Sequence, residues 1–451
     1  MSDKPLTMKQ SAGMTNSPSR KPISTNQPLK PKAFVAEDRP QLSTPSNPFN
    51  GKCRSVESFE KLNKIGEGTY GTVYRARDRR TGQIVALKKI KMNIEKDGMP
   101  VTALREISLL NTVNDHPNIV KLYEVVVGYK LSSVFLVFEY CEHDVSILLD
   151  SRKNLFSESE IKCLLRQLLK AMDYMHKQYI IHRDIKLSNL LYNGHGQLKV
   201  ADFGLARFYG TPAVNTAELT SVEQQNEKLT PKVQTLWYRA PELLLGVESY
   251  STAVDMWAVG CIFGELLLSR PVMPGKQDLN QLELIYELLG EPNEKIWPGY
   301  LQLPAIKNLK KDENGDVVPI VKVSSEPSES GSRLRDRIKS VVGQRLSRSG
   351  YDLLESMLQY DPNKRITAAD ALNHEYFSTP PHTKPIDMMP VFPSYHTDTD
   401  YNHRRRHHKE SEESIKPPIP IHGVSSSVAA PSAKPKARIE SDRASKRPRH
   451  S

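Results

Sequence analysis

The sequence has few cysteines and no long apolar segment. Its four cysteines, at positions 53, 141, 163 and 261, form no C-x-x-C pair, which disfavours both a disulfide framework and a zinc site. We therefore expect reduced cysteines in an intracellular protein. No run reaches the roughly 18 to 20 apolar residues that a membrane span needs. The first twenty residues contain no apolar segment of the secretory type, so neither secretion nor membrane association is expected.

Positive charge is concentrated at the two ends of the chain. The net charge is +11, but residues 1–50 hold 7 Lys or Arg against 3 Asp or Glu, and residues 378–451 hold 13 against 8. These ends also contain 19 of the 32 prolines. Segments of this composition bury too little apolar surface to fold, so both are predicted to be disordered tails. Because the rest of the chain is nearly neutral, any nucleic-acid binding is expected only in the basic tails.

Between the tails, the expected elements change from strands to helices. Strands are expected within residues 61–65, 72–77, 83–91 and 133–140, and helices within 101–112, 157–177, 253–268, 278–289, 350–359 and 367–373. Ser157 and Glu160 form a capping-box pattern at the start of the long helix. This order predicts an α+β fold with a small β-rich lobe followed by a larger α-rich lobe. Two polar segments, 211–229 and 307–348, are expected to be surface insertions.

A glycine-rich run is the first sign of chemistry. Residues 66–73 read GEGTYGTV, a G-x-G-x-x-G-x-V pattern whose glycines let the backbone approach phosphates closely. The run lies between two expected strands, whereas a dinucleotide-binding turn joins a strand to a helix. Its position therefore favours a hairpin that covers the phosphates of a nucleotide.

Further motifs follow in a fixed order. They are VALK at residues 85–88, LREI at 104–107, HRDIKLSN at 182–189, DFG at 202–204 and APE at 240–242. Together with the glycine-rich run, they make residues 59–377 resemble a eukaryotic protein kinase. The resemblance implies a bilobal fold, with an N-lobe over about 59–140 and a C-lobe over about 141–377. It also implies transfer of the ATP γ-phosphate to protein.

The resemblance also implies roles for the motif residues. Phosphoryl transfer depends mainly on positioning and charge neutralisation. Asp184 is expected to orient the substrate hydroxyl, and Lys186 to stabilise charge at the γ-phosphate. Asn189 and Asp202 carry the oxygen ligands that Mg²⁺ prefers, so ATP and Mg²⁺ are the expected cofactors.

The nucleotide pocket is located by the same resemblance. Lys88 is expected to hold the phosphates as a catalytic residue, and Glu106 to hold Lys88. Phe138 is the expected gatekeeper, and Asp144 the expected ribose contact. The other expected ATP contacts are the hinge residues Glu139 and Cys141, together with Ile65, Gly66, Glu67, Gly68, Thr69, Tyr70, Gly71, Thr72, Val73, Ala86 and Leu191.

Other segments resemble the cyclin-dependent kinases in particular. PVTALRE at residues 100–106 matches five of the seven positions of both the PSTAIRE and the PITSLRE helices, and TLWYRAPE at 235–242 is similar to the same family. Residues 53–71 are most similar to the cyclin-dependent kinase 10 subfamily, whereas residues 251–267 are as similar to the cyclin-dependent kinase 11 subfamily. A MAP kinase would carry Thr-x-Tyr where TPK stands at 230–232. The resemblance implies a cyclin partner and protein substrates with Ser or Thr acceptors.

Regulation is expected at the activation segment and at the glycine-rich run. Thr230 stands where this family is phosphorylated for activation. The resemblance implies three arginines that read this phosphate: Arg105, Arg183 and Arg207. Thr69 and Tyr70 are expected sites of inhibitory phosphorylation, because a phosphate there would repel the nucleotide. The family prefers proline after the acceptor, and Gln234, where relatives usually carry Val, is expected to weaken that preference.

Two further expectations concern the alternatives and the location of the protein. A catalytically weak cyclin-binding scaffold is the alternative to an active kinase, but the five residues that such a protein would have lost are present: Lys88, Glu106, Asp184, Asn189 and Asp202. Short basic runs at residues 404–409 and 446–449 are of the nuclear-import type, so a mainly nuclear protein is predicted.

Overall fold

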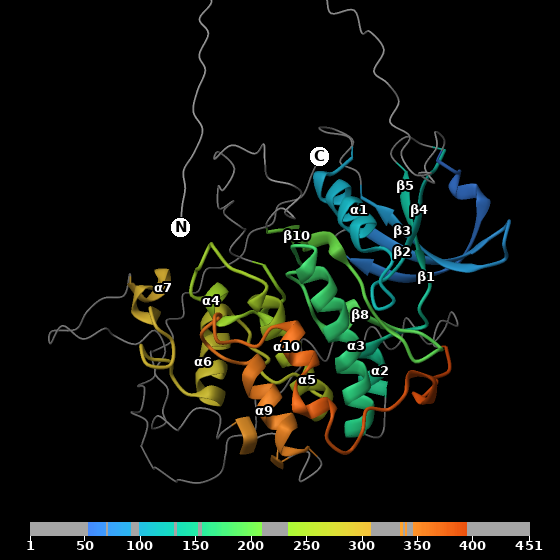
Figure 1. Cartoon of the computed structure of the whole chain (residues 1–451). Helices are drawn as coiled ribbons and strands as arrows, with labels where there is room; N and C mark the ends of the chain where they lie inside the picture. The colour runs from blue at the N-terminus through green and yellow to red at the C-terminus, as the bar shows by residue number, and fades with distance from the viewer. Residues whose placement is uncertain are drawn as a thin grey trace, which may run out of the picture. The chain divides into compact units, whose positions relative to one another are not determined.

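The computed structural model describes residues 53–68, 71–91, 99–129, 133–151, 156–209, 233–307, 334–336, 339–340 and 346–394 (Figure 1). The insertion 211–229, most of the insertion 307–348, residues 1–50 and residues 395–451 lie outside this description. Thr69, Tyr70 and Thr230 also lie outside it. Among the helices that are described, none has the length and apolar character needed to cross a membrane.

The described chain up to Glu139 forms a five-stranded antiparallel sheet together with one helix. Its strand order is β1-β2-β3-β5-β4, and its strands are β1 (Phe59–Gly68), β2 (Gly71–Asp78), β3 (Ile84–Ile90), β4 (Leu122–Val127) and β5 (Val134–Glu139). The β-branched and aromatic residues of β3 and β5 suit a central position in a sheet. The four expected strands are therefore present. The sheet also contains β4, a strand that the sequence analysis did not predict.

One helix accompanies this sheet. Helix α1 (Val101–Val113) buries Ala103, Glu106, Leu109 and Leu110 along one face. The apolar members of that face follow the helical spacing read from the sequence. The buried carboxylate of Glu106 is the exception, and it is part of the site described below.

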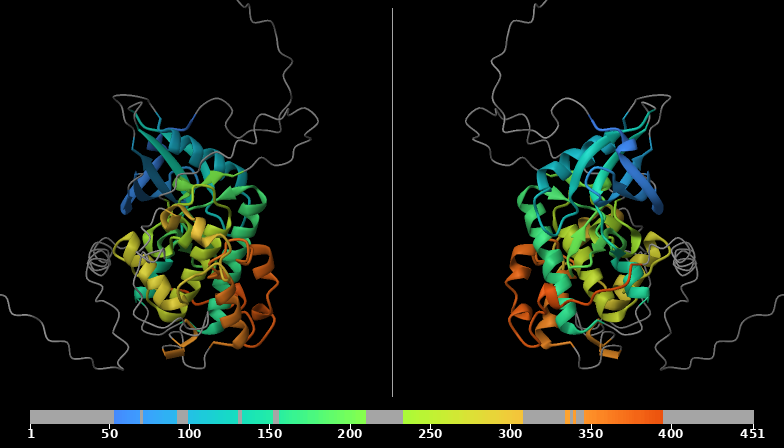
Figure 2. Two further views of the ribbon diagram at one scale, coloured as in Figure 1. Left: turned by 90° about the vertical axis from the view of Figure 1, so that its left-hand side faces the viewer. Right: turned by 90° about the vertical axis from the view of Figure 1, so that its right-hand side faces the viewer.

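The described chain after Glu139 is mainly helical, as Figures 1 and 2 show. Helix α3 (Glu158–Lys177) begins with the predicted capping box, since Ser157 accepts from the Glu160 backbone N–H and Glu160 accepts from that of Ser157. Helix α5 (Ala253–Leu268) is buried along its whole length, which explains why it is apolar on all sides. The other helices are α2 (Val145–Ser151), α4 (Pro241–Leu244), α6 (Asp278–Leu289), α7 (Pro304–Lys307), α9 (Arg348–Met357) and α10 (Ala368–Leu372).

Two small sheets lie beside the helices. One has the order β6-β8-β9, from β6 (His143–Asp144), β8 (Leu190–Tyr192) and β9 (Leu198–Val200). The other pairs β7 (Ile180–Ile181) with β10 (Arg207–Phe208). Val120 donates to the Val200 carbonyl at 2.9 Å, so the chain leading into β4 is bonded to the small sheet. The α+β fold with a β-rich and an α-rich part is thus the one predicted.

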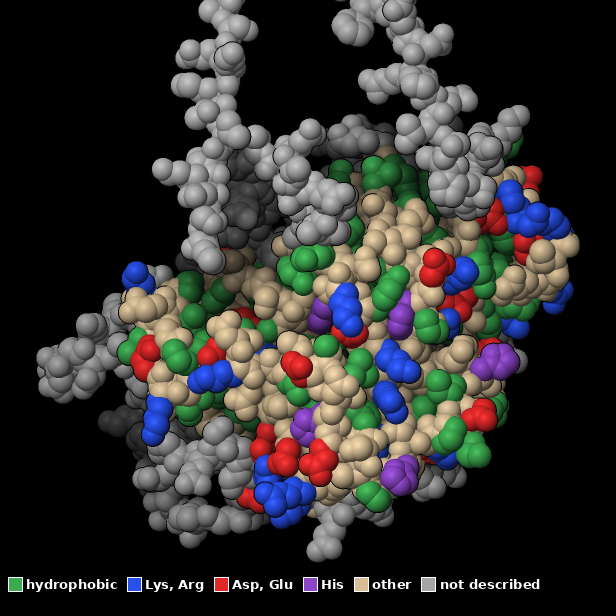
Figure 3. Space-filling view, viewed as in Figure 1, with side chains coloured by type: hydrophobic (Ala, Val, Ile, Leu, Met, Phe, Trp, Pro, Cys, Tyr) green, Lys and Arg blue, Asp and Glu red, His purple; other side chains and the backbone are tan. Residues whose placement is uncertain are grey.

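The predicted C-terminal tail begins too early. Residues 378–394 are placed against the helical part, where Met389 is buried and Lys384 pairs with Glu160 at 3.1 Å. The high proline content of this segment suggested disorder, but prolines also suit an extended segment whose backbone N–H groups are not needed. On the face shown in Figure 3, acidic and basic side chains are interspersed, in keeping with the near-neutral composition of this part of the chain.

Candidate active site

Lys88 connects three elements of the fold. Its Nζ lies 2.6 Å from Glu106 Oε1 on α1 and 3.1 Å from Asp202 Oδ1, just after β9. Because Lys88 stands on β3, these two ion pairs connect the five-stranded sheet both to α1 and to the segment after β9. The Lys88 and Glu106 side chains are only 13% and 6% exposed, whereas the Asp202 side chain remains 34% exposed. Asp202 is therefore the member of the trio that is open to a ligand.

Lys88 and Asp202 stabilise each other's charge, whereas at Glu106 burial outweighs the nearby Lys88 ammonium and raises the pKa of the carboxyl. Burial alone would lower the pKa of Lys88, but the nearby Glu106 and Asp202 carboxylates outweigh it and raise that pKa. Burial alone would raise the pKa of Asp202, but the Lys88 ammonium outweighs it and lowers that pKa. Lys88 is thus a cation and Asp202 an anion at neutral pH, as binding phosphate and a divalent metal requires.

The Asp184 carboxylate is held from three directions. Asn189 donates to Oδ2 at 3.0 Å, Lys186 lies 2.9 Å from the same oxygen, and Thr235 donates to Oδ1 at 2.9 Å. Lys186 also donates to the Thr235 hydroxyl at 3.1 Å. The sequence analysis assigned no role to Thr235. Its only signal was its place at the start of TLWYRAPE, because the contact spans 51 residues of chain.

A fully buried carboxylate fixes the loop that carries Asp184. Asp255 on α5 accepts from the backbone N–H groups of His182 and Arg183, at 2.9 Å each, and lies 3.1 Å from His176 Nε2. Arg183 has a left-handed φ of +65°, which is costly for a non-glycine residue. The two bonds to Asp255 hold this backbone in place. Asp255 is a second functional residue that the sequence analysis missed.

The expected nucleotide residues line the strands near Lys88. Gly66 pairs with Val73 and Glu67 with Thr72 across the β1–β2 hairpin, and Ala86 pairs with Phe138 across β3 and β5. Gly71 is needed for packing, since a Cβ there would lie 2.0 Å from the Lys89 carbonyl oxygen. Ile65 and Gly68 complete the described part of β1 near the turn.

The expected hinge and ribose residues also have structural partners. Glu139 pairs with Lys199 at 2.9 Å, and Cys141 is buried, which raises the pKa of its thiol. Asp144 Oδ1 accepts from the Ser146 backbone N–H at 2.8 Å, so it also caps α2. Leu191 pairs with Asp144 in the small sheet, which brings these two predicted contacts together.

The arginines expected to read a phosphate occupy different environments. Arg183 donates from Nε to the Leu205 carbonyl at 2.8 Å and from Nη1 to Tyr250 Oη at 2.9 Å. Arg207 begins β10, opposite Ile181, and Arg105 is exposed on α1. Their predicted phosphate-bearing partner, Thr230, lies outside the described residues, so this site stays a prediction.

Gln234 has its side chain turned into the protein. It is 5% exposed and has a left-handed φ of +68°. Its amide donates to the Val254 carbonyl at 2.9 Å and accepts from the Ala240 N–H at 3.1 Å. Its backbone carbonyl accepts from Arg239 Nη2 at 2.9 Å. Both ends of the amide are used internally, so the side chain does not face a bound peptide.

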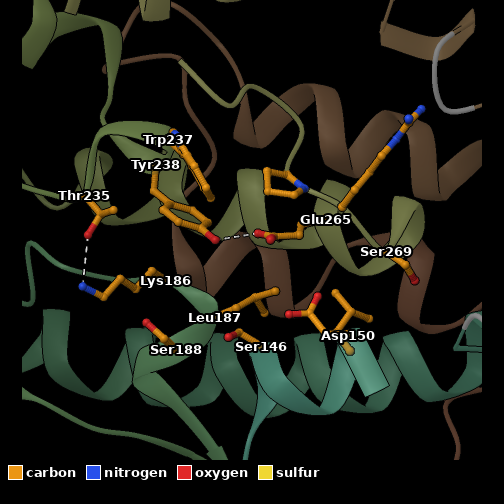
Figure 4. Close-up of a pocket in the computed structure, with 13 residues that line it drawn as sticks. Ser146, Asp150, Lys186, Leu187, Ser188, Thr235, Trp237, Tyr238, Glu265 and Ser269 are labelled. Carbon is orange, nitrogen blue, oxygen red and sulfur yellow. Dashed lines mark hydrogen bonds between the residues drawn. The ribbon is translucent and has the colours of Figure 1, made fainter. Parts of the chain in front are cut away.

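A pocket opens beside the Asp184 loop (Figure 4). It encloses about 230 Å³ between α2, the residues that follow Asp184 and the end of α5. Lys186 and Thr235 stand at one end, where the dashed line in Figure 4 joins them, and the Tyr238 hydroxyl donates to buried Glu265 at 2.7 Å. The pocket thus adjoins Lys186 and Thr235, two of the groups that hold Asp184.

Comparison with known proteins decides the family. The family model described as "Protein kinase domain" matches residues 59–377. The chain belongs to the protein kinase family. These are the bounds over which the motifs resemble a kinase, and the family uses ATP together with a divalent metal ion.

Its relatives within the family are cyclin-dependent kinases. The chain is 50% identical over 345 residues to cyclin-dependent kinase G-2 of Oryza sativa subsp. indica, 49% identical over 342 residues to probable cyclin-dependent kinase 10 of Dictyostelium discoideum, and 48% identical over 345 residues to cyclin-dependent kinase 10 of Homo sapiens. Each alignment covers 76% of this chain, but 44%, 84% and 86% of the respective relative. The chain therefore spans less than half the length of the rice relative. The predicted likeness to cyclin-dependent kinase 10 is confirmed.

Proposed function

We propose that this chain is an active, cyclin-activated serine/threonine kinase that uses ATP and Mg²⁺. The observation that carries the proposal is the joint placement of the Lys88–Glu106–Asp202 trio and the Asp184–Lys186–Thr235 cluster, each linked by the hydrogen bonds given above. A scaffold that only binds a partner has no need to maintain both clusters. The kinase names of the relatives support the same proposal.

The two clusters divide the work of phosphoryl transfer. Lys88, held by Glu106, binds nucleotide phosphates as a fixed cation. Asp184 accepts a hydrogen bond from the Ser or Thr hydroxyl and aims its oxygen at the γ-phosphate. Lys186 supplies positive charge next to the transferred group. Fixed charges of this kind stabilise a transition state whose charge lies on phosphate oxygens.

The donor set fits Mg²⁺. Asn189 donates through Nδ2 to the backbone carbonyl and to Oδ2 of Asp184, at 2.7 and 3.0 Å, so its Oδ1 is the end that remains to bind a metal. Asp202 adds an exposed carboxylate. Among the described residues, no group of three or more His, Cys, Asp or Glu side chains forms a metal cage. Mg²⁺ in kinases typically takes one or two protein oxygens plus phosphate oxygens, and it neutralises the phosphate charge when bound.

We propose that the preference for proline after the acceptor is retained. The Gln234 carbonyl is held toward Arg239 by a hydrogen bond, so its orientation is not set to accept from an incoming N–H at that position. An unpaired buried N–H costs about 1 to 3 kcal/mol, and proline has no N–H to lose. The inward-facing side chain of Gln234 removes the reason for expecting a weaker preference.

A cyclin is proposed to act on α1. Val101 and Leu104 on this helix are 60% and 51% exposed, and they are offset from the face that buries Glu106. A partner that covers them would fix the helix in the position where Glu106 reaches Lys88. Phosphorylation of Thr230 is proposed to add to this effect through Arg183.

The proposal can be tested with the full chain, tagged and purified together with its bound partners. The complex should transfer labelled phosphate from ATP and Mg²⁺ to Ser and Thr, but not Tyr, in a degenerate peptide library with proline scanned at the next position. We expect transfer that EDTA abolishes and that proline enhances. No transfer from the partner-bound complex, with a known kinase active in the same buffer, would overturn the proposal.

A further inference from the structure

Residues 378–394, here named the C-terminal strap, follow the helical part from α3 to the small sheet. The strap is the orange-red segment at the lower right of Figure 1. The Thr379 carbonyl accepts from Lys162 Nζ at 2.8 Å, and the Lys384 backbone N–H donates to the Ser159 carbonyl at 3.1 Å. Lys384 Nζ also pairs with Glu160 at 3.1 Å. These contacts fix the first half of the strap along the start of α3.

The strap then crosses the turn between β8 and β9 at very short range. Gly196 in this turn has a φ of +77°, and a Cβ there would lie 2.3 Å from the Ile386 carbonyl oxygen. Three residues after Ile386, Met389 is 4% exposed and belongs to the main hydrophobic core, whereas its neighbour Met388 is exposed. Only glycine allows this approach, so the turn and the strap fit one another closely.

The end of the strap packs against β6 and β8. Tyr192 donates its hydroxyl to the Pro390 carbonyl at 2.7 Å, and His143 Nε2 lies 3.2 Å from the Phe392 carbonyl, which can only accept. The Phe392 ring lies 5.9 Å from the rings of both His143 and Tyr192, edge to face.

The register of the small sheet connects these contacts to the nucleotide site. His143 is paired with Tyr192, and the next pair along the strands is Asp144 with Leu191. Successive side chains of a strand point to opposite faces, and paired residues share a face. Since Phe392 covers the face of His143 and Tyr192, Asp144 and Leu191 belong to the other face. Those two are the predicted ribose and adenine contacts.

We propose that the strap is a structural part of the nucleotide site, with Phe392 as a positioning residue that supports Asp144 and Leu191 from behind. This inference rests on the proposed function, because it takes these two residues to contact ATP. Two-residue and three-residue strands have few bonds of their own, so packing from one face decides how firmly the other face is held. Loss of Phe392 should therefore weaken nucleotide binding more than it weakens binding of the acceptor peptide.

The test compares Phe392→Ala with Val391→Ala in the full-length, partner-bound protein. Val391 is the strap neighbour of Phe392 and is 69% exposed, so its truncation removes similar chemistry without the packing. Affinity for a non-hydrolysable ATP analogue with Mg²⁺ is measured by calorimetry, and KM for ATP and for peptide by initial rates. We expect a threefold to tenfold weaker analogue affinity and an equal rise in KM for ATP in Phe392→Ala, no change in KM for peptide, and wild-type values in Val391→Ala. Phe392→Leu, which keeps most of the apolar volume, should restore at least half of the lost affinity.

The outcomes separate this inference from the proposed function. Unchanged analogue affinity in folded Phe392→Ala would overturn the role of the strap while leaving the kinase intact. An equal rise in both KM values would also overturn it, because it would indicate general loosening. If Phe392→Ala fails to fold, Tyr192→Phe removes only the bond to Pro390, and analogue affinity within the error of wild type would then count against the proposal. Wild-type protein that binds the analogue but transfers no phosphate would overturn the proposed function alone, and wild-type protein that binds no analogue would overturn both.

Discussion

Thr235 donates a hydrogen bond from its hydroxyl to Asp184 Oδ1 at 2.9 Å and accepts one from Lys186 Nζ at 3.1 Å. The segment before APE is thereby bonded to the loop that carries the proposed catalytic groups. A displacement of Thr235 would therefore move or release a hydrogen-bond partner of Asp184. The relationship suggests that Thr235 sets the orientation of Asp184 and the position of the Lys186 charge.

Replacing Thr235 should separate the effect of the hydroxyl from that of the side-chain volume. Thr235→Ala removes the bonds to Asp184 and Lys186, so we expect kcat to fall by about tenfold to a hundredfold, since loss of a partner that orients a functional group typically has effects of this order. Thr235→Ser keeps the hydroxyl and is the matched control, with kcat expected within about threefold of wild type. Equal rates in the two variants, measured on the same peptide, would show that the hydroxyl has no such role.

Gln234→Val tests whether this side chain takes part in peptide selection. The buried Ala240 N–H would lose its acceptor, so the free energy of unfolding should fall by about 1 to 3 kcal/mol. The ratio of kcat/KM for peptides with proline and with alanine after the acceptor should stay within about twofold, because the carbonyl bonded to Arg239 is retained. A proline preference that rises tenfold or more in this variant would instead favour the original expectation that Gln234 weakens it.

The proposed phosphate site can be examined with a double-mutant cycle. Arg183 already holds Leu205 and Tyr250, and a phosphate on Thr230 would add an anion within its reach under the proposal. Thr230→Ala should lower activity of the cyclin complex by about tenfold, and Arg183→Ala should add little in that background, because each removes one side of the same charge-assisted contact. Losses that are fully additive would mean that the two residues act separately.

The sequence predicted helix bounds and caps well, because these depend on residues that are close together along the chain. The bounds of α5 and α6 agree with the predicted ranges, and the Ser157–Glu160 capping box formed as expected. Thr235 and Asp255 were missed because their roles depend on contacts 51 and more than 70 residues away along the chain. The strap was missed for a different reason. Its composition resembles that of a disordered tail, and only the fit of Met389 and Phe392 to the folded part shows that it is held.

Nuclear import is predicted to depend on the basic runs at residues 404–409 and 446–449. A fluorescent reporter fused to residues 395–451, which leaves out the strap, should collect in the nucleus. Replacing the arginines and lysines of both runs with glutamine should return the reporter to an even distribution. A reporter that stays cytoplasmic with the intact runs would contradict the prediction.

The central claim is that Asp184 and Lys88 make this chain a working phosphotransferase. The most direct measurement is the single-turnover rate of phosphate transfer to a Ser-Pro peptide by the partner-bound full chain, for wild type, Asp184→Asn, Lys88→Met and Asp115→Asn. Asp115 is an exposed carboxylate after α1 and is the charge-matched control. We predict a loss of about 10² to 10⁴ for Asp184→Asn and for Lys88→Met, the range expected for a positioned catalytic group, with Asp115→Asn at the wild-type rate. Transfer at the wild-type rate in folded Asp184→Asn or Lys88→Met would contradict the assignment of the active site.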